Sequence, residues 1–143
     1  MKFILTLAII LLPFLSFSQS IVSYHQTPNR SEVAYAYEFK DKFRPEIRLY
    51  PSTSIEDFFI KLMFNYDWLE KDNYEFYSGI SLIGSTLRGS ILGFPVGFNF
   101  YPFDNKNFGF LMEFSPNFPV GENGAAYFGG SWGIRYRFNK KEK

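Results

Sequence analysis

The sequence predicts an all-β protein, an up-and-down antiparallel transmembrane β-barrel of about eight strands. Two observations predict this fold. The 143 residues include 19 Phe, 10 Tyr and 2 Trp, so that 22% of the chain is aromatic, yet the mean hydropathy is slightly negative, at −0.13. Apolar and aromatic side chains also alternate with small or charged ones, as in the stretch GSWGIRYRF at residues 130–138. A barrel with an apolar outer wall and a polar interior produces both features.

Composition narrows the range of functions. The net charge of +1 gives no reason to expect nucleic acid as a partner. The chain has no cysteine, which excludes a disulfide framework, a thiolate metal site and a cysteine nucleophile. A length of 143 residues suits a single domain.

The first residues have the pattern of an export signal. Lys2 precedes an apolar run at residues 3–15, and small residues follow just before Gln19. We therefore predict a cleaved signal peptide at residues 1–18 and an outer-membrane barrel domain at residues 19–143. A retained N-terminal anchor helix is the alternative interpretation.

The rest of the chain has a period of two, which is typical of strands, and no convincing helical period. The predicted strands are 20–26, 31–40, 46–50, 58–68, 74–83, 90–101, 108–117 and 125–138. Short charged links at residues 40–42, 70–73 and 104–107 alternate with looser links that are rich in Pro, Ser and Gly. This alternation is typical of outer-membrane barrels, in which the periplasmic turns are tight, and it places both chain ends on the periplasmic side.

Nearly every charged residue of the predicted strands falls on the face opposite the rings. A cationic side chain that faces lipid near the midplane costs about 2–4 kcal/mol, which is enough to enforce this pattern. The inward charges are nearly balanced, and we expect them to pair as a salt-bridged network that fills the lumen rather than leaving a channel. This predicted lumen network consists of Glu38, Glu46, Arg48, Lys61, Asp67, Glu75, Glu113, Arg135 and Arg137.

Some residues fit the barrel pattern less simply. Four apolar side chains point inward in this register: Phe59, Met63, Ile83 and Leu111. Pro95 lies in the middle of a predicted strand and lacks an N–H donor, which predicts a β-bulge there.

Aromatic residues also gather next to the tight turns and the C-terminus. There they would form a girdle at the periplasmic membrane interface, where Trp and Tyr are enriched. The predicted girdle consists of Phe39, Trp68, Tyr74, Tyr101, Phe103, Phe108, Tyr136 and Phe138.

With these features the mature chain resembles the small outer-membrane β-barrel proteins, particularly the short ones of Bacteroidetes. The resemblance rests on Ser-Phe-Ser-Gln at residues 16–19, GFPVGFNFYP at 93–102, NFGF at 107–110 and the closing stretch at 130–138. It implies location in the outer membrane, contact with outer-membrane lipid and a monomeric state. It also implies that Phe138, the aromatic end of the last strand, is read by the barrel-insertion machinery.

No catalytic, cofactor-binding or metal site is predicted. His25 is the only histidine, has no obvious partner in the sequence and is expected to lie at the surface. The leading hypothesis is therefore a barrel that is not an enzyme or an open porin. Its role would be structural, or binding through the outer loops, with residues 51–57 and 118–124 as the expected contact surfaces.

Two other functions are compatible with the sequence. The first is a soluble periplasmic or secreted barrel that binds an apolar ligand, with rings inside and charges outside. The second is a lipid-modifying barrel enzyme that uses His25 together with side chains of the outer rim. The rim candidates are Ser52, Thr53, Ser54, Glu56, Asp57, Ser85, Thr86, Arg88 and Glu122.

Overall fold

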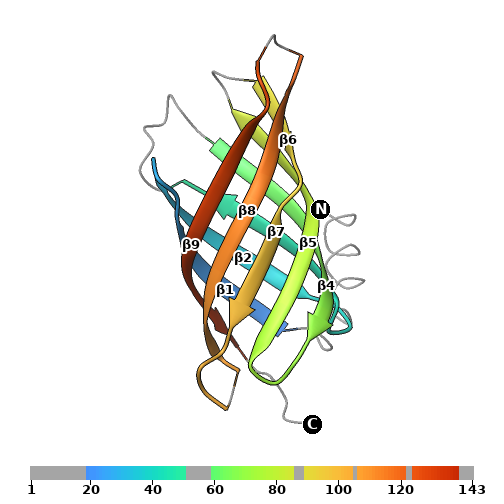
Figure 1. Ribbon diagram of the computed structural model, residues 1–143, viewed down its shortest axis with the longest axis vertical. Coiled ribbons are helices and arrows are strands. Elements are labelled where there is room, and N and C mark those ends of the chain that lie inside the picture. The colour runs from blue at the N-terminus through green and yellow to red at the C-terminus, as the bar shows by residue number, and fades with distance from the viewer. Residues whose placement is uncertain (1–18, 51–58, 86–88, 105, 122–123, 139–143) are drawn as a thin grey trace, which may run out of the picture.

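The computed structural model describes residues 19–50, 59–85, 89–104, 106–121 and 124–138. The strands, shown in Figure 1, are β1 (Gln19–Gln26), β2 (Ser31–Glu38), β3 (Phe43–Leu49), β4 (Phe59–Glu70), β5 (Tyr74–Ser85), β6 (Gly89–Gly93), β7 (Val96–Phe100), β8 (Phe108–Val120) and β9 (Tyr127–Arg137). The predicted signal peptide and the predicted contact loop at residues 51–57 lie outside the described residues. Among those described, no helix has the length and apolarity to cross a membrane.

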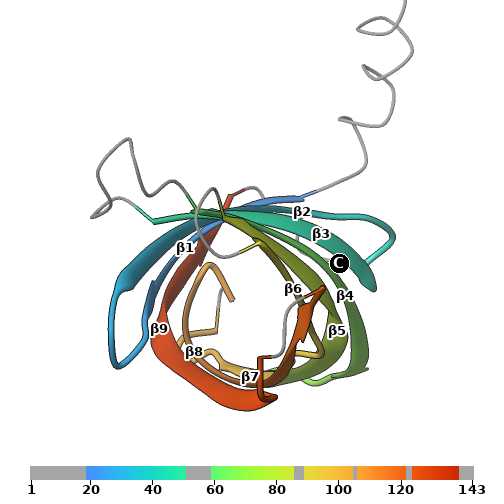
Figure 2. The same cartoon turned by 90° about the horizontal axis from the view of Figure 1, so that it is seen from above.

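The sheet closes on itself, as Figure 2 shows from above. β1 pairs in antiparallel fashion with β2 on one side and with β9 on the other. β6 and β7 together occupy one position in the wall, because both pair with β5 and both pair with β8. The nine strands therefore fill eight positions around the barrel, and the predicted fold class is confirmed.

The break between β6 and β7 corrects the expectation of a bulge at Pro95. The partners of β5 advance in equal steps across the break, from Ser81↔Gly93 to Ser78↔Val96, so no extra residue is inserted. Pro95 lacks only the N–H donor of the ladder, and its carbonyl still accepts a 2.9 Å hydrogen bond from the Gly79 N–H. The alternation of faces therefore continues through the break. The register shift of the β4–β5 pair lies instead between Asp67 and Leu69.

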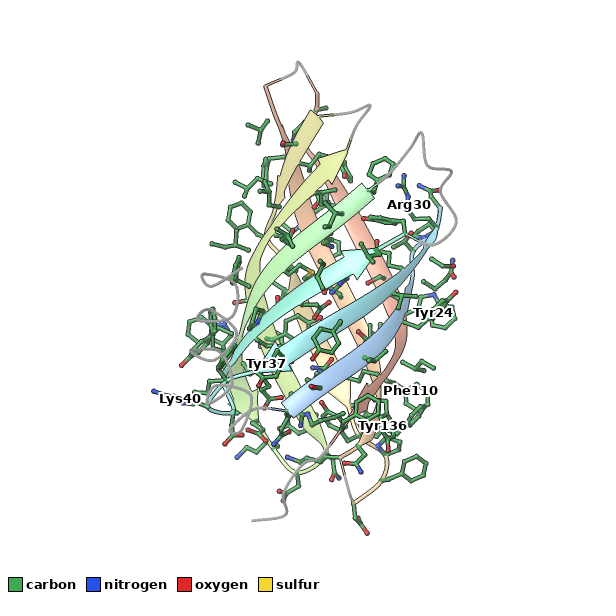
Figure 3. The ribbon with its side chains drawn as sticks, turned by 180° about the vertical axis from the view of Figure 1, so that it is seen from behind. Tyr24, Arg30, Tyr37, Lys40, Phe110 and Tyr136 are labelled. Carbon is green, nitrogen blue, oxygen red and sulfur yellow. The ribbon has the colours of Figure 1, made fainter. Side chains whose placement is uncertain are left out.

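The links between strands lie at two opposite ends of the barrel. At one end, which we call the turn end, links join β2 to β3, β4 to β5 and β7 to β8. The pairing of Ile21 with Arg137 places the start of β1 and the end of β9 at this end as well. At the opposite end, the mouth end, residues 27–30 join β1 to β2. Figure 3 shows Lys40 at the turn end and Arg30 at the mouth end.

The side chains segregate by face along every strand. The outer wall carries large apolar groups such as Met112, which is 66% exposed, and Trp132, which is 65% exposed. The interior carries polar groups such as Arg48, which is fully buried. Phe59, Met63, Ile83 and Leu111 also point inward, as the sequence predicts.

The observed register is opposite to the one that a soluble barrel with an apolar ligand requires. Glu38, Arg48, Lys61, Glu113 and Arg135 are the side chains that distinguish the two arrangements, and all five are buried in the interior.

Candidate functional site: a charged lumen

The interior holds an ionic network. All nine residues of the predicted lumen network are buried, and Glu32 and Arg44 join them. The buried ionic groups are the six carboxylates Glu32, Glu38, Glu46, Asp67, Glu75 and Glu113 and the five cations Arg44, Arg48, Lys61, Arg135 and Arg137. An unpaired charge in such a place is costly, so the pairing among these groups decides whether the barrel is stable.

Arg48 is the centre of one cluster, which we call the Arg48 cluster: Arg48, Glu32, Glu46, Lys61 and Glu113. Its Nη2 lies 2.6 Å from Glu113 Oε2 and its Nη1 lies 3.0 Å from Glu113 Oε1, so that Arg48 binds this carboxylate in a bidentate manner. Its Nε donates to Glu46, and its Nη1 lies 3.4 Å from Glu32 Oε2. One guanidinium thus neutralises three carboxylates.

The contact between Arg48 and Glu113 crosses the barrel. Arg48 is in β3 and Glu113 is in β8. β2, β1 and β9 separate these strands on one side of the ring, and β4, β5 and the β6/β7 position separate them on the other. The ion pair therefore joins opposite walls and occupies the lumen between them.

Glu113 has two further partners. Lys61 Nζ lies 3.5 Å from its Oε1, and the Tyr77 hydroxyl donates to its Oε2 at 2.8 Å. The Tyr77 ring has room because residue 97 is glycine, and a Cβ at Gly97 would overlap that ring.

Glu75 is the centre of a second cluster near the turn end, the Glu75 cluster: Glu75, Glu38, Arg135 and Arg137. Arg137 Nη2 lies 3.0 Å from Glu75 Oε1 and 2.7 Å from Glu38 Oε2, and Arg135 Nη1 lies 3.6 Å from Glu75 Oε2. Here one carboxylate serves two cations.

The remaining buried ion pair joins Arg44 in β3 to Asp67 in β4. Arg44 Nη1 lies 3.1 Å from Asp67 Oδ1, and the Arg44 guanidinium carbon lies 4.4 Å from the centre of the Tyr77 ring. Arg44 was absent from the predicted network because the predicted strand began at residue 46. Extending the same period of two backward past Pro45 would have placed Arg44 on the inner face.

Tyr101 corrects the predicted girdle. It is 1% exposed and points into the lumen, where its hydroxyl donates to Glu75 Oε2 at 2.6 Å. The prediction placed it by its proximity to a turn, whereas its parity with the outward-facing Phe100 places it inside. Five of the other predicted girdle residues are exposed, namely Trp68, Tyr74, Phe103, Tyr136 and Phe138. The remaining two, Phe39 and Phe108, are partly exposed.

His25 is not at the surface as expected. It is 1% exposed in β1 and faces the lumen, because β1 closes the barrel and Tyr24 is the outward residue next to it. The Nε2 atom of His25 lies 3.0 Å from Ser23 Oγ and 3.7 Å from Glu46 Oε1. The signal that could have found this position is the alternation Val22, Tyr24 against Ser23, His25.

The arrangement of Ser23, His25 and Glu46 is not that of a catalytic triad. In a triad the serine and the acid contact different nitrogens of the imidazole. Here both approach Nε2, and His25 Nδ1 has no hydrogen-bond partner among the described residues. Of the rim candidates, Ser85 ends β5, and the other eight lie outside the described residues. In the described part of the chain, no group of three His, Cys, Asp or Glu could hold a metal ion.

Comparisons with known proteins agree on the fold. Neither protein-family models nor curated protein sequences give a match. Among solved structures, the chain is similar to the N-terminal β-barrel domain of OprF from Pseudomonas aeruginosa (TM-score 0.63, 11% identity, 85% of this chain and 98% of that chain). It is also similar to the de novo designed TMB2.3, with a TM-score of 0.61 and 12% identity over 87% of this chain and 95% of that chain. A third similar structure is the Yersinia pestis outer membrane protein Ail, with a TM-score of 0.52 and 13% identity over 85% of this chain and 98% of that chain. The chain therefore has the fold of small transmembrane β-barrels.

Proposed function

We propose that this protein is an outer-membrane barrel whose rings face lipid, and whose ion-paired lumen closes the barrel to solutes. Its role is structural, or binding at the mouth end. The observation that carries this proposal is the separation of faces: large apolar side chains cover the outside, and eleven ionic groups are buried inside.

The outer wall supports the location in a membrane. Apolar side chains are exposed on strands all around the barrel, including Val33, Leu62, Ile80, Phe98 and Ile134. Soluble monomers rarely expose one continuous apolar patch of more than a few hundred Å². Acyl chains are the environment in which such a wall is stable, and they also require the closed ladder that this barrel has.

The lumen supports a closed barrel. An eight-stranded barrel has an interior just wide enough for side chains to fill. Here the Arg48–Glu113 pair reaches from one wall to the opposite one, and Tyr77 and Tyr101 add buried rings to the same interior.

Several finer points of the proposal rest on the sequence. We propose export by the signal peptide, a monomeric state, contact with outer-membrane lipid and recognition of Phe138 by the insertion machinery. The seven girdle residues other than Tyr101 would mark the periplasmic interface. The resemblance to short Bacteroidetes barrels is supported by sequence motifs alone, and we expect no enzymatic activity.

Fractionation combined with a conductance measurement tests the proposal. The full chain should remain in the membrane fraction after a high-salt wash and leave it only with detergent. In planar bilayers the purified protein should show no steady single-channel steps. Release by salt without detergent would favour the soluble apolar-ligand barrel, and regular conductance steps would contradict a closed lumen.

A further inference from the structure

The mouth end contains a cavity that the ionic network leaves open. We propose that this cavity binds a small carboxylate with an apolar, ring-sized body, and that the guanidinium of Arg30 holds the carboxylate group. This inference rests on the proposed binding role of the mouth end and names the ligand class for it.

The cavity lies above the Arg48 cluster and has a volume of about 230 Å³. Arg30, Tyr50 and Phe59 line one side of it, and β8 and β9 contribute other lining residues. Glu113 also lines it, so the cavity meets the ion-paired part of the lumen. Pockets for drug-sized ligands have volumes of roughly 300–1,000 Å³, so this cavity suits a smaller molecule.

Arg30 is held in place by rings rather than by acids. Its guanidinium carbon lies 4.6 Å from the centre of the Phe59 ring and 5.0 Å from that of Tyr50. Within the described residues, its side chain makes no ion pair and donates no hydrogen bond to an acceptor. A guanidinium stacked on rings keeps its planar fork of N–H donors, which matches a carboxylate.

The acids that face the cavity already have donors. Glu32 is paired with Arg48 at 3.4 Å and accepts a hydrogen bond from the Tyr50 side chain. Glu113 is occupied by Arg48, Lys61 and Tyr77. Among the charged groups of the described lining, Arg30 is therefore the one without an ionic partner, and its N–H donors call for an anionic acceptor.

Two further features of the lining fit the rest of such a ligand. The Ser131 Oγ is buried and has no hydrogen-bond partner in the described part of the chain, so it can bind a second ligand oxygen. Phe59, Ile83, Ile91 and Tyr127 supply apolar surface for a ring-sized body. An aromatic carboxylate combines both requirements.

Titration calorimetry on the folded full chain in detergent micelles tests this inference, with benzoate as the probe and benzyl alcohol as its neutral match. We expect saturable binding of one benzoate per barrel and much weaker binding of benzyl alcohol. Because a hydrogen bond to a charged group contributes about 1.5–3 kcal/mol, Arg30→Gln should weaken benzoate binding about tenfold or more. Arg30→Lys, which keeps the charge but loses the fork, should fall between the two.

The matched control is Lys71→Gln, which removes an exposed cation at the turn end and should leave benzoate binding unchanged. Circular dichroism on every variant verifies that the barrel is folded. Equal affinity of Arg30→Gln and the unchanged chain, equal binding of benzyl alcohol and benzoate, or no benzoate binding at all would overturn the inference. If the chain still requires detergent for extraction, each of these outcomes overturns the ligand inference alone and leaves the proposed membrane location intact.

Discussion

The Arg48 cluster and the Glu75 cluster both neutralise buried charges, but the central residue is a cation in the first and a carboxylate in the second. In the first, a single cation serves three carboxylates, whereas in the second a single carboxylate serves two cations. Each cluster also has a tyrosine that donates to its main carboxylate, Tyr77 to Glu113 and Tyr101 to Glu75. A narrow barrel can therefore bury many charges when a few central residues each neutralise several neighbours.

Arg48 and Glu75 differ in how many of their partners keep another ionic contact when the residue is removed. If Arg48 is lost, Lys61 is the cation that remains in contact with Glu113, and Glu46 and Glu32 lose their guanidinium partner. If Glu75 is lost, Arg137 keeps Glu38 at 2.7 Å. We therefore expect the lumen to depend more on Arg48 than on Glu75.

The largest effect is expected from Arg48→Met. Removal of one partner from a buried ion pair typically costs about 3–5 kcal/mol, and here three carboxylates lose the same partner. Urea unfolding of the barrel refolded into vesicles measures the change in the free energy of unfolding. Lys42→Met, which removes an exposed cation in a turn, is the control and should change it by about 0.5 kcal/mol or less. Equal effects of the two substitutions would refute a central role for Arg48.

Glu75→Gln should destabilise the barrel less, by about 1.5–3 kcal/mol. The amide keeps an oxygen that can accept from Tyr101, and Arg137 retains Glu38. The same urea experiment checks this value. A loss as large as that of Arg48→Met would show that the barrel depends equally on the two clusters and would contradict the greater role of Arg48.

The barrel itself was predictable from the sequence because its physical cause acts on every strand. Since lipid excludes charge, the outward positions of a transmembrane barrel are mainly apolar, and a period of two follows directly from strand geometry. The absence of a bulge at Pro95 could not be predicted. A proline in a strand is compatible with either a bulge or a simple gap in the ladder, and only the pairing of Gly93 and Val96 with β5 distinguishes them.

Each cluster has one glycine that makes room for its tyrosine ring, and substitution of either glycine by alanine should destabilise the barrel. A Cβ at Gly97 would overlap the Tyr77 ring, and a Cβ at Gly109 would lie 2.8 Å from the Tyr101 ring. Overpacking of this kind costs about 1–3 kcal/mol. Gly130→Ala is the matched control, since its added Cβ would have its nearest neighbour at 3.7 Å. Thermal unfolding that ranks Gly130→Ala with the other two would contradict this role.

The smallest expected effect separates an inner tyrosine from an outer one. Tyr101→Phe removes a 2.6 Å hydrogen bond to Glu75 and should cost about 1 kcal/mol or more. Tyr136→Phe changes a ring on the exposed outer wall and should be nearly neutral. Paired unfolding curves compare them, and a reversed order would return Tyr101 to the outer wall.

The membership of the lumen network was largely predictable, but its pairing was not. Parity along a strand places Glu113 and Arg48 inside, and the order of eight strands puts their strands on opposite walls. The sequence does not show which inward side chains lie at the same height in the lumen, and this decides the pairing. Tyr101 and His25 were misplaced for a related reason. His25 lies near the end of β1 and Tyr101 directly follows β7. In the prediction, doubt about the first strand and closeness to a link outweighed parity at these two positions.

Fluorescence quenching by brominated acyl chains tests the central claim, that the rings face lipid while the charges are enclosed. The chain has two tryptophans, so the variant Trp68→Phe leaves Trp132, which is exposed on the outer face of β9, as the only indole. In vesicles, brominated lipid should quench Trp132 strongly and aqueous iodide should quench it little. Efficient quenching by iodide with no response to brominated lipid would contradict the account.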